Sequence, residues 1–334
     1  MIRLDAPAKV NLGLRIEGRR ADGYHLLESL FVPLDLADRV SVAIRRVTAG
    51  GSAQDRVSLS VHGERAAGVP TDASNLAARA AAGFLEAAGQ EGLAVEIGLE
   101  KRVPSPAGLG GGSSDAGAVL RALAALVPRV LPAEKLAALA LRLGADVPFF
   151  LDPRPAMVRG VGERVEPVSG LPSLVLLLVH PGIGLSTAAV YAAFDALDAA
   201  LTPRSPGPTV MPPEGPLEPE ALARLLVNDL EPAALRLCPP IARLRSQLSD
   251  AGALAVGMSG SGPTLFGVFP DESSARSAAA KFGRENFERE AGRLNGRRNG
   301  PPIWTWVART ANAPQPELPL SSDRRSDDGA SPNW

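Results

Sequence analysis

A glycine-rich loop followed by two serines stands directly before a helix-forming stretch. Residues 103–127 read VPSPAGLGGGSSDAGAVLRALAALV, with four glycines between positions 108 and 112. Glycine permits positive φ angles and lets a ligand approach the backbone closely. The helix that follows offers free N–H groups and the positive end of its dipole. This pattern favours a phosphate-binding loop, and a flexible connector with capping serines is the alternative.

The polar residues after the glycines refine that prediction. Ser113 and Ser114 can cap a helix that begins at about Ser113, and their hydroxyls can also contact phosphate or a magnesium ion. Asp115 is placed to complement the helix dipole. The loop lacks the lysine of GxxxxGK[ST] and is not GxGxxG, although it uses the same physical principle.

Two further segments carry side chains suited to acid–base chemistry. Lys9 and Asn11 lie two positions apart in the apolar stretch 7–14, so they share one face of a strand. A lysine on a buried strand needs a partner. Asp146, within RLGADVPFFLD (142–152), either caps a helix or takes part in chemistry. If it faces Lys9, the lysine would keep the aspartate ionised and neutralise charge on a phosphoryl group. Otherwise Lys9 is a surface lysine.

A turn and a second glycine cluster are the remaining candidates. RADGYH (20–25) places Tyr24 and His25 at a turn, either as a packed loop or as a stacking ring beside a hydrogen-bonding ring. GMSGSGPT (257–264) separates two strand-like runs. It is either a tight hairpin or a second set of backbone amides that faces the first loop.

These residues must be positioned by interleaved strands and helices. Alternating or apolar runs predict strands, and runs of helix formers bounded by caps and glycines predict helices. Asp72, Ser74 and Asn75 are cap candidates for one helix. The expected strands are 39–47, 56–63, 93–104 and 173–182, with a hairpin at 156–168 and strand–turn–strand at 253–269; the expected helices are 72–89, 113–127, 132–144 and 186–197. The mixture indicates an α+β (mixed α/β) enzyme-like fold.

Composition excludes several classes of protein. The 334 residues carry a formal net charge of −1, which argues against a broad nucleic-acid surface. Cys238 is the single cysteine, so no intramolecular disulfide or cysteine zinc site is expected. The start lacks a signal peptide, and LVLLLV (174–179) is too short to span a membrane. We expect a cytoplasmic protein, monomer or homodimer, with an irregular proline-rich segment at 202–219 and a disordered tail at 311–334.

Taken together, the segments resemble the GHMP kinases. PSPAGLGGGSSDA (104–116) is similar to the phosphate-loop signature of that superfamily, which includes galactokinase, homoserine kinase and mevalonate kinase. PAKVNLGLRIEGRRADGYH (7–25) and LGADVPFFL (143–151) are most similar to those members that phosphorylate 4-diphosphocytidyl-2-C-methyl-D-erythritol. The matching segments run in the same order, from Ala6 to about Phe269.

The resemblance implies a fold and an activity. The N-terminal domain, 1–160, would resemble the second domain of ribosomal protein S5 and bind ATP. The C-terminal domain, 161–310, would be an α/β sandwich with a mostly antiparallel sheet. The two-domain kinase would use ATP and Mg²⁺ to phosphorylate the tertiary 2-hydroxyl of the methylerythritol unit, in the cleft between its domains.

The resemblance also implies roles for single residues. Lys9 and Asp146 match the catalytic pair. Asn75 matches a position near the adenine, and Lys101 would line the same pocket. GMSGSGPT would lie near the phosphates. The nucleotide phosphate loop would comprise Pro104, Ser105, Pro106, Ala107, Gly108, Leu109, Gly110, Gly111, Gly112, Ser113 and Ser114; the cytosine site would comprise Asn11, Tyr24, His25, Thr187 and Tyr191.

Two other functions and some departures stay open. A kinase for homoserine or mevalonate has no base to stack on, so RADGYH argues against it. A non-catalytic nucleotide-binding sensor needs no pair such as Lys9 and Asp146. Ser-Pro-Ala follows Pro104 where glycines are common in the family. Gly111 and Gly112 stand where other GHMP kinases carry serine, one of them a metal ligand, so the magnesium ligands are left unassigned. The region 270–310 is longer and more charged than expected.

Overall fold

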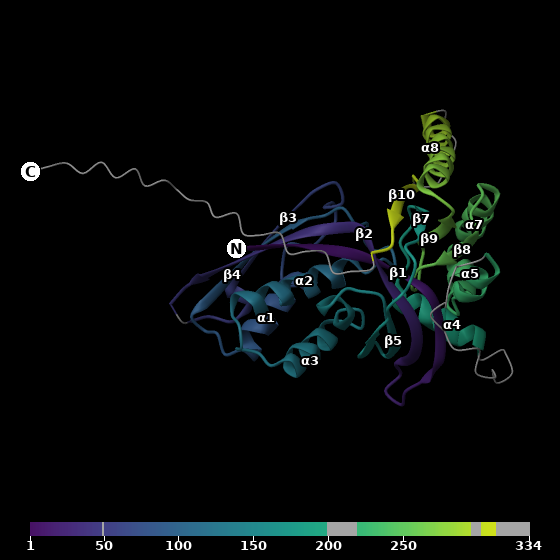
Figure 1. The fold of residues 1–334 in the computed structure, drawn as a ribbon. Helices are drawn as coiled ribbons and strands as arrows, with labels where there is room; N and C mark the ends of the chain where they lie inside the picture. Colours follow the sequence, from purple (N-terminus) through teal and green to yellow (C-terminus); the bar gives the residue numbers. More distant parts are fainter. Residues whose placement is uncertain (49, 199–218, 295–301, 312–334) are drawn as a thin grey trace, which may run out of the picture.

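Two β-sheets with helices packed on them make up the fold (Figure 1). The computed structural model describes residues 1–48, 50–198, 219–294 and 302–311. The first sheet contains β1 (Ile2–Arg19), β2 (His25–Arg46), β3 (Val57–His62), β4 (Leu93–Glu100), β5 (Ala156–Gly160) and β6 (Arg164–Pro167). The second contains β7 (Val175–His180), β8 (Ala255–Met258), β9 (Leu265–Phe269) and β10 (Trp304–Arg309).

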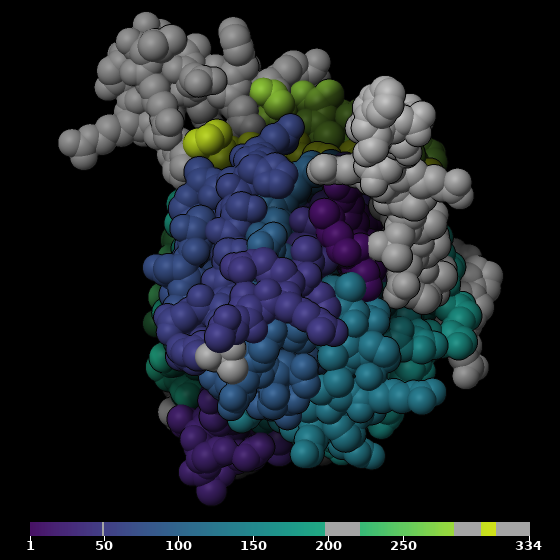
Figure 2. Space-filling view, turned by 90° about the vertical axis from the view of Figure 1, so that its left-hand side faces the viewer, coloured from purple at the N-terminus to yellow at the C-terminus, as the bar shows by residue number. Residues whose placement is uncertain are grey.

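The long β1–β2 hairpin organises the first sheet. β2 pairs with β1, β4 and β5, so it occupies the centre of the order β3-β4-β2-β5-β6. β3 and β4 run parallel, whereas the other pairs of this sheet are antiparallel. The turn of the hairpin projects from the body of the molecule in both overall views (Figures 1 and 2). The residues of RADGYH therefore lie at an end of the fold where a ligand can reach them.

Helices cover each sheet, which confirms the α+β prediction. α1 (Leu76–Ala87), α2 (Gly111–Leu126) and α3 (Ala133–Leu143) lie on one side of the first sheet, and the short helices η1 (Gln54–Arg56) and η2 (Pro148–Leu151) belong to the same half. The second sheet, antiparallel throughout its order β10-β7-β9-β8, is accompanied by α4 (Thr187–Asp198), α5 (Pro219–Leu225), α6 (Glu231–Leu237), α7 (Pro240–Asp250) and α8 (Glu272–Leu294). None of the helices in these ranges has both the length and the apolar character that a bilayer crossing requires.

A shared hydrophobic core joins the two halves. Ala8, Val10 and Leu12 of β1 are buried in one cluster with Leu176 of β7 and Phe266 of β9. Because side chains alternate along a strand, the intervening residues of β1 point to its other face. Lys9 and Asn11 are therefore held on a strand that is buried on both faces.

The structure confirms most of the expected elements. The predicted hairpin at 156–168 is β5–β6, and β6 pairs with β5. The first sheet therefore continues to Pro167, and the domain division expected at residue 160 stays a prediction. Residues 202–218 of the proline-rich segment and residues 312–334 of the tail lie outside the described residues.

The side chain of Lys101 forms a buried charge cluster that the sequence analysis does not predict. It is only 2% exposed, and its ammonium group pairs with the buried carboxylates of Asp38 and Asp115. Asp38 Oδ1 also accepts hydrogen bonds from the backbone N–H groups of Arg102 and Val103, at 2.5 and 2.9 Å. The Lys101 side chain therefore ties the end of β4 to α2, and its expected place beside the adenine stays a prediction.

Burial shifts the acid–base balance of this cluster. Removal from water raises the pKa of Asp115 to about 7; the Lys101 charge lowers it and the Asp38 charge adds to the rise. Although burial by itself lowers the pKa of Lys101, the two carboxylates raise it above its ordinary value. Asp115 thus has a structural role beyond the dipole complement that the sequence indicates.

We expect Asp115→Asn to gain stability relative to the wild type as the pH rises. The folded state keeps the Asp115 proton up to about pH 7, whereas an ordinary aspartate loses it near 3.8. Between these values the folded state binds more protons than the unfolded state, so this group's contribution to the free energy of unfolding falls as pH rises. The asparagine does not titrate. Urea unfolding of both proteins from about pH 5 to about pH 8 measures the difference.

Asp55→Asn is the control. Hydrogen bonds from Ser52 lower the pKa of the exposed Asp55, so it is ionised across this interval in both states. The difference between the free energies of unfolding of Asp55→Asn and the wild type should stay constant over this pH range. If the free energy of unfolding of Asp115→Asn differed from that of the wild type by the same amount at every pH, the predicted titration of Asp115 would be contradicted.

Candidate active site

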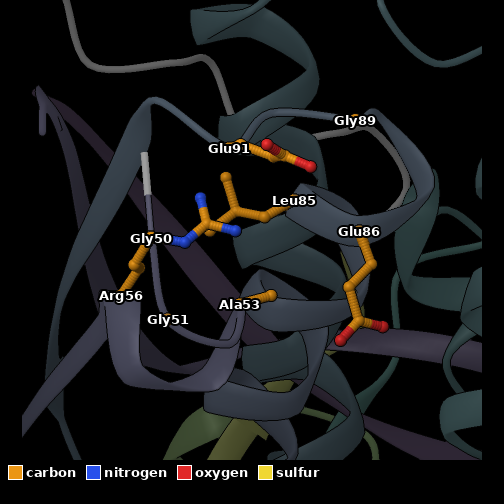
Figure 3. A pocket seen from close by; sticks show the side chains of 8 residues that line it. All are labelled: Gly50, Gly51, Ala53, Arg56, Leu85, Glu86, Gly89 and Glu91. Carbon is orange, nitrogen blue, oxygen red and sulfur yellow. The ribbon is translucent and has the colours of Figure 1, made fainter. Parts of the chain in front are cut away.

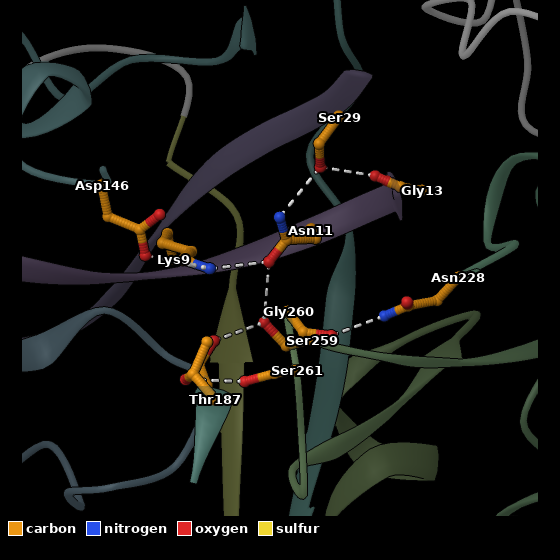
Figure 4. A network of polar contacts seen from close by, with 11 residues as sticks. Lys9, Asn11, Gly13, Ser29, Asp146, Thr187, Asn228, Ser259, Gly260 and Ser261 are labelled. Atoms are coloured by element: carbon orange, nitrogen blue, oxygen red, sulfur yellow. Dashed lines mark hydrogen bonds and ion pairs between the residues drawn. The ribbon is translucent and has the colours of Figure 1, made fainter. Parts of the chain in front are cut away.

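Lys9 and Asp146, which are distant in sequence, meet in the structure (Figure 4). Lys9 Nζ lies 3.5 Å from Asp146 Oδ2 and donates a 2.7 Å hydrogen bond to Asn11 Oδ1. The ammonium group also stands 4.7 Å from the centre of the Phe31 ring. The Lys9 side chain is 3% exposed and that of Asp146 is 32% exposed. The buried ammonium group of Lys9 is thus paired with the carboxylate of Asp146, which is partly exposed to solvent.

Asp146 reaches this position because its segment packs tightly on α2. It lies between the end of α3 and η2, and η2 has no side-chain cap. Gly117 of α2 makes room for η2, since a Cβ there would lie 2.5 Å from Phe150 Cβ. Phe149 and Phe150 are fully buried. The carboxylate therefore pairs with Lys9 instead of capping η2.

Asn11 is held in one orientation by a short chain of hydrogen bonds. Its Nδ2 donates to Ser29 Oγ at 2.8 Å, and Ser29 Oγ donates to the Gly13 carbonyl at 2.6 Å. The amide oxygen of Asn11 is thereby fixed toward Lys9. Sequence reasoning missed Ser29, although it is a polar residue within the otherwise apolar centre of β2.

The glycine-rich loop leads into α2 as the sequence indicates, but the helix begins earlier. α2 starts at Gly111, with Gly110 at its N-cap in the left-handed region (φ 71°) and no side-chain cap. Ser113 and Ser114 therefore lie inside the first turn and do not cap the helix. The first-turn N–H groups are left without a capping side chain, which leaves them available to an anion.

Close packing accounts for part of the glycine content. A Cβ on Gly108 would lie 2.4 Å from the Ser259 carbonyl oxygen, and one on Gly110 would lie 2.9 Å from Phe150 Cζ. Gly112 differs, because its nearest contact would be Leu76 Cδ1 at 3.8 Å. Packing therefore requires glycine at 108 and 110, while the surface at 112 is open to a close approach.

The second glycine cluster is both a hairpin turn and a neighbour of the first loop. It connects the antiparallel strands β8 and β9. Ser259 Oγ donates to the Gly108 carbonyl at 2.9 Å, and Asn228 Nδ2 donates to the carbonyls of Met258 and Gly260 at 2.9 and 2.8 Å. Asn228 was not predicted from the sequence; its signal is an amide in the apolar stretch LLVNDL.

Three of the candidate base-binding residues, Tyr24, His25 and Tyr191, lie around the start of β2. The His25 ring packs on Tyr191 of α4 with a 4.8 Å centroid separation. The Tyr24 side chain is 65% exposed. Burial, together with the nearby Asp146 charge, raises the pKa of Tyr191 to about 12. Tyr191 is therefore close enough to Asp146 to feel its charge.

The other predicted residues fall into two groups. Thr187 Oγ1 lies 3.0 Å from Ser261 Oγ, so it belongs to the β8–β9 turn region. Asn75 caps α1 by accepting from Ala77 N at 2.9 Å, and its Nδ2 donates to the Pro70 carbonyl. The polar atoms of the Asn75 side chain are thus used within the chain. Of the phosphate-loop residues, Ala107, Leu109, Gly111 and Ser114 are buried, Ser105 and Pro106 are exposed, and Pro104, Gly108, Gly110, Gly112 and Ser113 are intermediate.

No preformed metal cage was found in the part of the chain that the structure describes. No group of three or more His, Cys, Asp or Glu side chains there is arranged to hold an ion. Ser114 is fully buried, and its hydroxyl lacks a hydrogen-bond partner. Ser113 and Asp146 are both partly exposed. This donor set fits an ion that arrives with the phosphates of a nucleotide, because Mg²⁺ keeps several waters and needs few protein ligands.

A separate pocket lies near the end of α1 (Figure 3). Arg56, Glu86 and Glu91 are among the residues that line it, and none of the candidate site residues does. The guanidinium of Arg56 already donates to the carbonyls of Gln90 and Leu93. This pocket is therefore distinct from the site at Lys9.

Comparisons with known proteins agree with this arrangement. Residues 75–152 match GHMP kinases N terminal domain, and residues 218–289 match GHMP kinases C terminal. The 4-diphosphocytidyl-2-C-methyl-D-erythritol kinase of Citrifermentans bemidjiense is 39% identical over 288 residues, covering 85% of this chain and 95% of that protein. The kinase of the same name from Anaeromyxobacter dehalogenans is 47% identical over 276 residues, covering 82% of each.

A solved structure extends the similarity to three dimensions. The crystal structure of a 4-(cytidine 5'-diphospho)-2C-methyl-D-erythritol kinase matches with a TM-score of 0.65 and 41% identity, and the match covers 93% of this chain and 100% of that one. The identity and the coverage exceed what a shared fold alone requires. The chain belongs to the GHMP kinases, in the family of the 4-diphosphocytidyl-2-C-methyl-D-erythritol kinases.

Proposed function

We propose that this chain transfers the γ-phosphoryl group of ATP to the 2-hydroxyl of 4-diphosphocytidyl-2-C-methyl-D-erythritol, in the non-mevalonate route to isoprenoid precursors. The observation that carries the proposal is the Lys9–Asp146 pair, 3.5 Å apart, beside two glycine loops that contact each other. The names and identities of the relatives support the choice of substrate.

Asp146 is the general base in this proposal. Its carboxylate accepts the proton of the 2-hydroxyl as the oxygen attacks the phosphorus. Lys9 pairs with that carboxylate and stabilises charge on the transferring group. Such transfers depend mainly on positioning and charge stabilisation, and Asn11 supplies positioning through its hydrogen bond with Lys9.

ATP is placed by the backbone at the start of α2. Phosphates approach the open surface at Gly112 and the uncapped first-turn amides. Asn75 caps α1 and precedes Leu76, the residue that a Cβ on Gly112 would lie nearest to. This closeness to the phosphate loop supports the proposed position of Asn75 near the adenine. Asp146 and the Ser113 hydroxyl, two partly exposed oxygens of the candidate set, would hold a Mg²⁺ ion bound with the nucleotide, and the ion would supply further charge neutralisation.

The cytosine group is bound by the hairpin turn and α4. The exposed Tyr24 ring is free to stack on a base, and Tyr191 with His25 forms the opposite wall. Stacking gives affinity, while the polar atoms of His25 give discrimination. Asn11 keeps its proposed place beside the cytosine site, with its side-chain amide already bonded to Lys9 and Ser29. Thr187 stands on the same helix as Tyr191. A cytoplasmic location and a monomeric or homodimeric state remain part of this proposal.

Transfer of labelled phosphate tests the function directly. The purified chain should label the cytidine diphosphate-linked substrate from γ-labelled ATP, and should leave homoserine and mevalonate unlabelled. CMP should compete with the substrate, because it shares the base. Labelling of homoserine or mevalonate instead would favour the alternative kinases, and nucleotide binding without substrate-dependent ADP release would indicate a sensor.

We expect Asp146→Asn to reduce kcat by about a hundredfold or more, because the base is lost while the shape is kept. ATP binding, measured by calorimetry, should stay near that of the wild type. Asp152→Asn is the matched control, since Asp152 is an exposed aspartate whose carboxylate contacts Arg154. Equal turnover of Asp146→Asn and wild type would remove Asp146 from the base role.

We expect Tyr24→Ala to raise the KM for the cytidine substrate by a factor equivalent to about 1–3 kcal/mol, through lost stacking. Tyr24→Phe keeps the ring and should keep most of the affinity. Because the side chain is exposed, neither change should alter the folded structure. An unchanged KM in the alanine variant would count against the cytosine site.

A further inference from the structure

A histidine–aspartate pair stands beside the proposed cytosine site and has no part in the phosphoryl transfer described above. His25 Nε2 lies 2.6 Å from Oδ1 of Asp195. His25 begins β2, whereas Asp195 belongs to α4, 170 residues later in the chain. The contact therefore joins the hairpin turn of the first sheet to a helix of the second half.

The imidazole is held in place on several sides. Its ring packs on Tyr191 at 4.8 Å and meets the edge of Phe194 at 5.9 Å. The other carboxylate oxygen of Asp195 lies 3.4 Å from Arg19 Nη1, which keeps the carboxylate in position from the solvent side. The side chain of His25 is only 10% exposed. Rotation of the ring by half a turn would break the contact with Asp195.

We propose that Asp195 is a specificity-determining residue: it holds His25 as the Nε2–H tautomer, so that Nδ1 presents a lone pair to the amino group of cytosine. An ionised carboxylate can only accept hydrogen bonds, so the neutral ring must place its proton on the nitrogen that faces Asp195. The inference rests on the proposed function, because it takes cytosine as the base bound here.

The two pyrimidines differ at the group that this lone pair would meet. Cytosine carries an amino donor where uracil carries a carbonyl acceptor. Nδ1 as an acceptor pairs with the amino group and opposes the carbonyl oxygen, and a site built for one hydrogen bond rejects the analogue that cannot make it. Asp195 would thus favour cytosine over uracil without contacting the base, because it determines which nitrogen of His25 carries the proton.

Nitrogen NMR reads the tautomer without any substrate. The chain has three histidines, so the His25 ring signals can be identified by comparison with His25→Gln. At a pH where the ring is neutral, Nδ1 should resonate as an unprotonated nitrogen and Nε2 as a protonated one. Asp195→Asn should mix the two forms, because a side-chain amide can face Nε2 with either its oxygen or its NH₂ group. A protonated Nδ1 in the wild type would overturn the proposal.

Kinetics with two substrates measure the consequence. In Asp195→Asn the ratio of kcat/KM for the cytidine substrate over its uridine analogue should fall about tenfold or more, mainly through KM. Its kcat at saturating cytidine substrate should stay within about twofold of the wild type, because Lys9 and Asp146 are untouched. Asp250→Asn, an exposed aspartate at the end of α7, controls for the change in charge. A ratio that is unchanged in Asp195→Asn would refute the role of Asp195.

CMP titration separates this inference from the function on which it rests. Addition of CMP should shift the His25 ring signals of the wild type. No shift at concentrations that saturate inhibition would remove His25 from the base site, and with it the inference. If CMP shifts the His25 ring signals but the ratio of kcat/KM for the cytidine and uridine substrates is unaltered in Asp195→Asn, the role of Asp195 is refuted. The kinase assignment would remain in place.

Discussion

The structure depends on placing one ammonium group where water is nearly absent. A buried lysine is unfavourable unless oxygen atoms replace its hydration. Lys9 has the carboxylate of Asp146 and the amide oxygen of Asn11, and an aromatic face supplied by Phe31. Those three partners come from separate parts of the first half of the chain. Their convergence is what makes the surrounding packing so specific.

The same requirement explains the glycines around the site. Gly108 and Gly110 are needed because the β8–β9 turn and the Phe150 ring come too close for a Cβ, and Gly117 lets the segment after Asp146 pack on α2. Glycine loses more entropy on folding than other residues. That loss is accepted where it brings the ammonium group, the carboxylate and the helix amides into one region. The loop is therefore a packing device as well as a candidate anion site.

Much of this could be predicted from the sequence, because local patterns were clear. The period of two placed Lys9 and Asn11 on one face, and Asn75 was a cap candidate that does cap α1. Three features could not be predicted in that way, because they depend on a backbone conformation or on long-range contacts that the pattern does not show. The start of α2 at Gly111 follows from the conformation of Gly110, and the burial of Lys101 follows from carboxylates at 38 and 115. The pairing of His25 with Asp195 joins elements that no local pattern relates.

The two faces of β1 limit which sequence changes this strand can accept. Ala8, Val10 and Leu12 fill the core between the sheets, while Lys9 and Asn11 alternate with them in the site. Deleting or inserting a single residue here would exchange the two sets, so that Lys9 would point into the hydrophobic core and apolar side chains would point toward Asp146. During evolution β1 can therefore change by substitution but not by insertion or deletion. A shift in its register would disturb the core between the sheets and the site at Lys9 together.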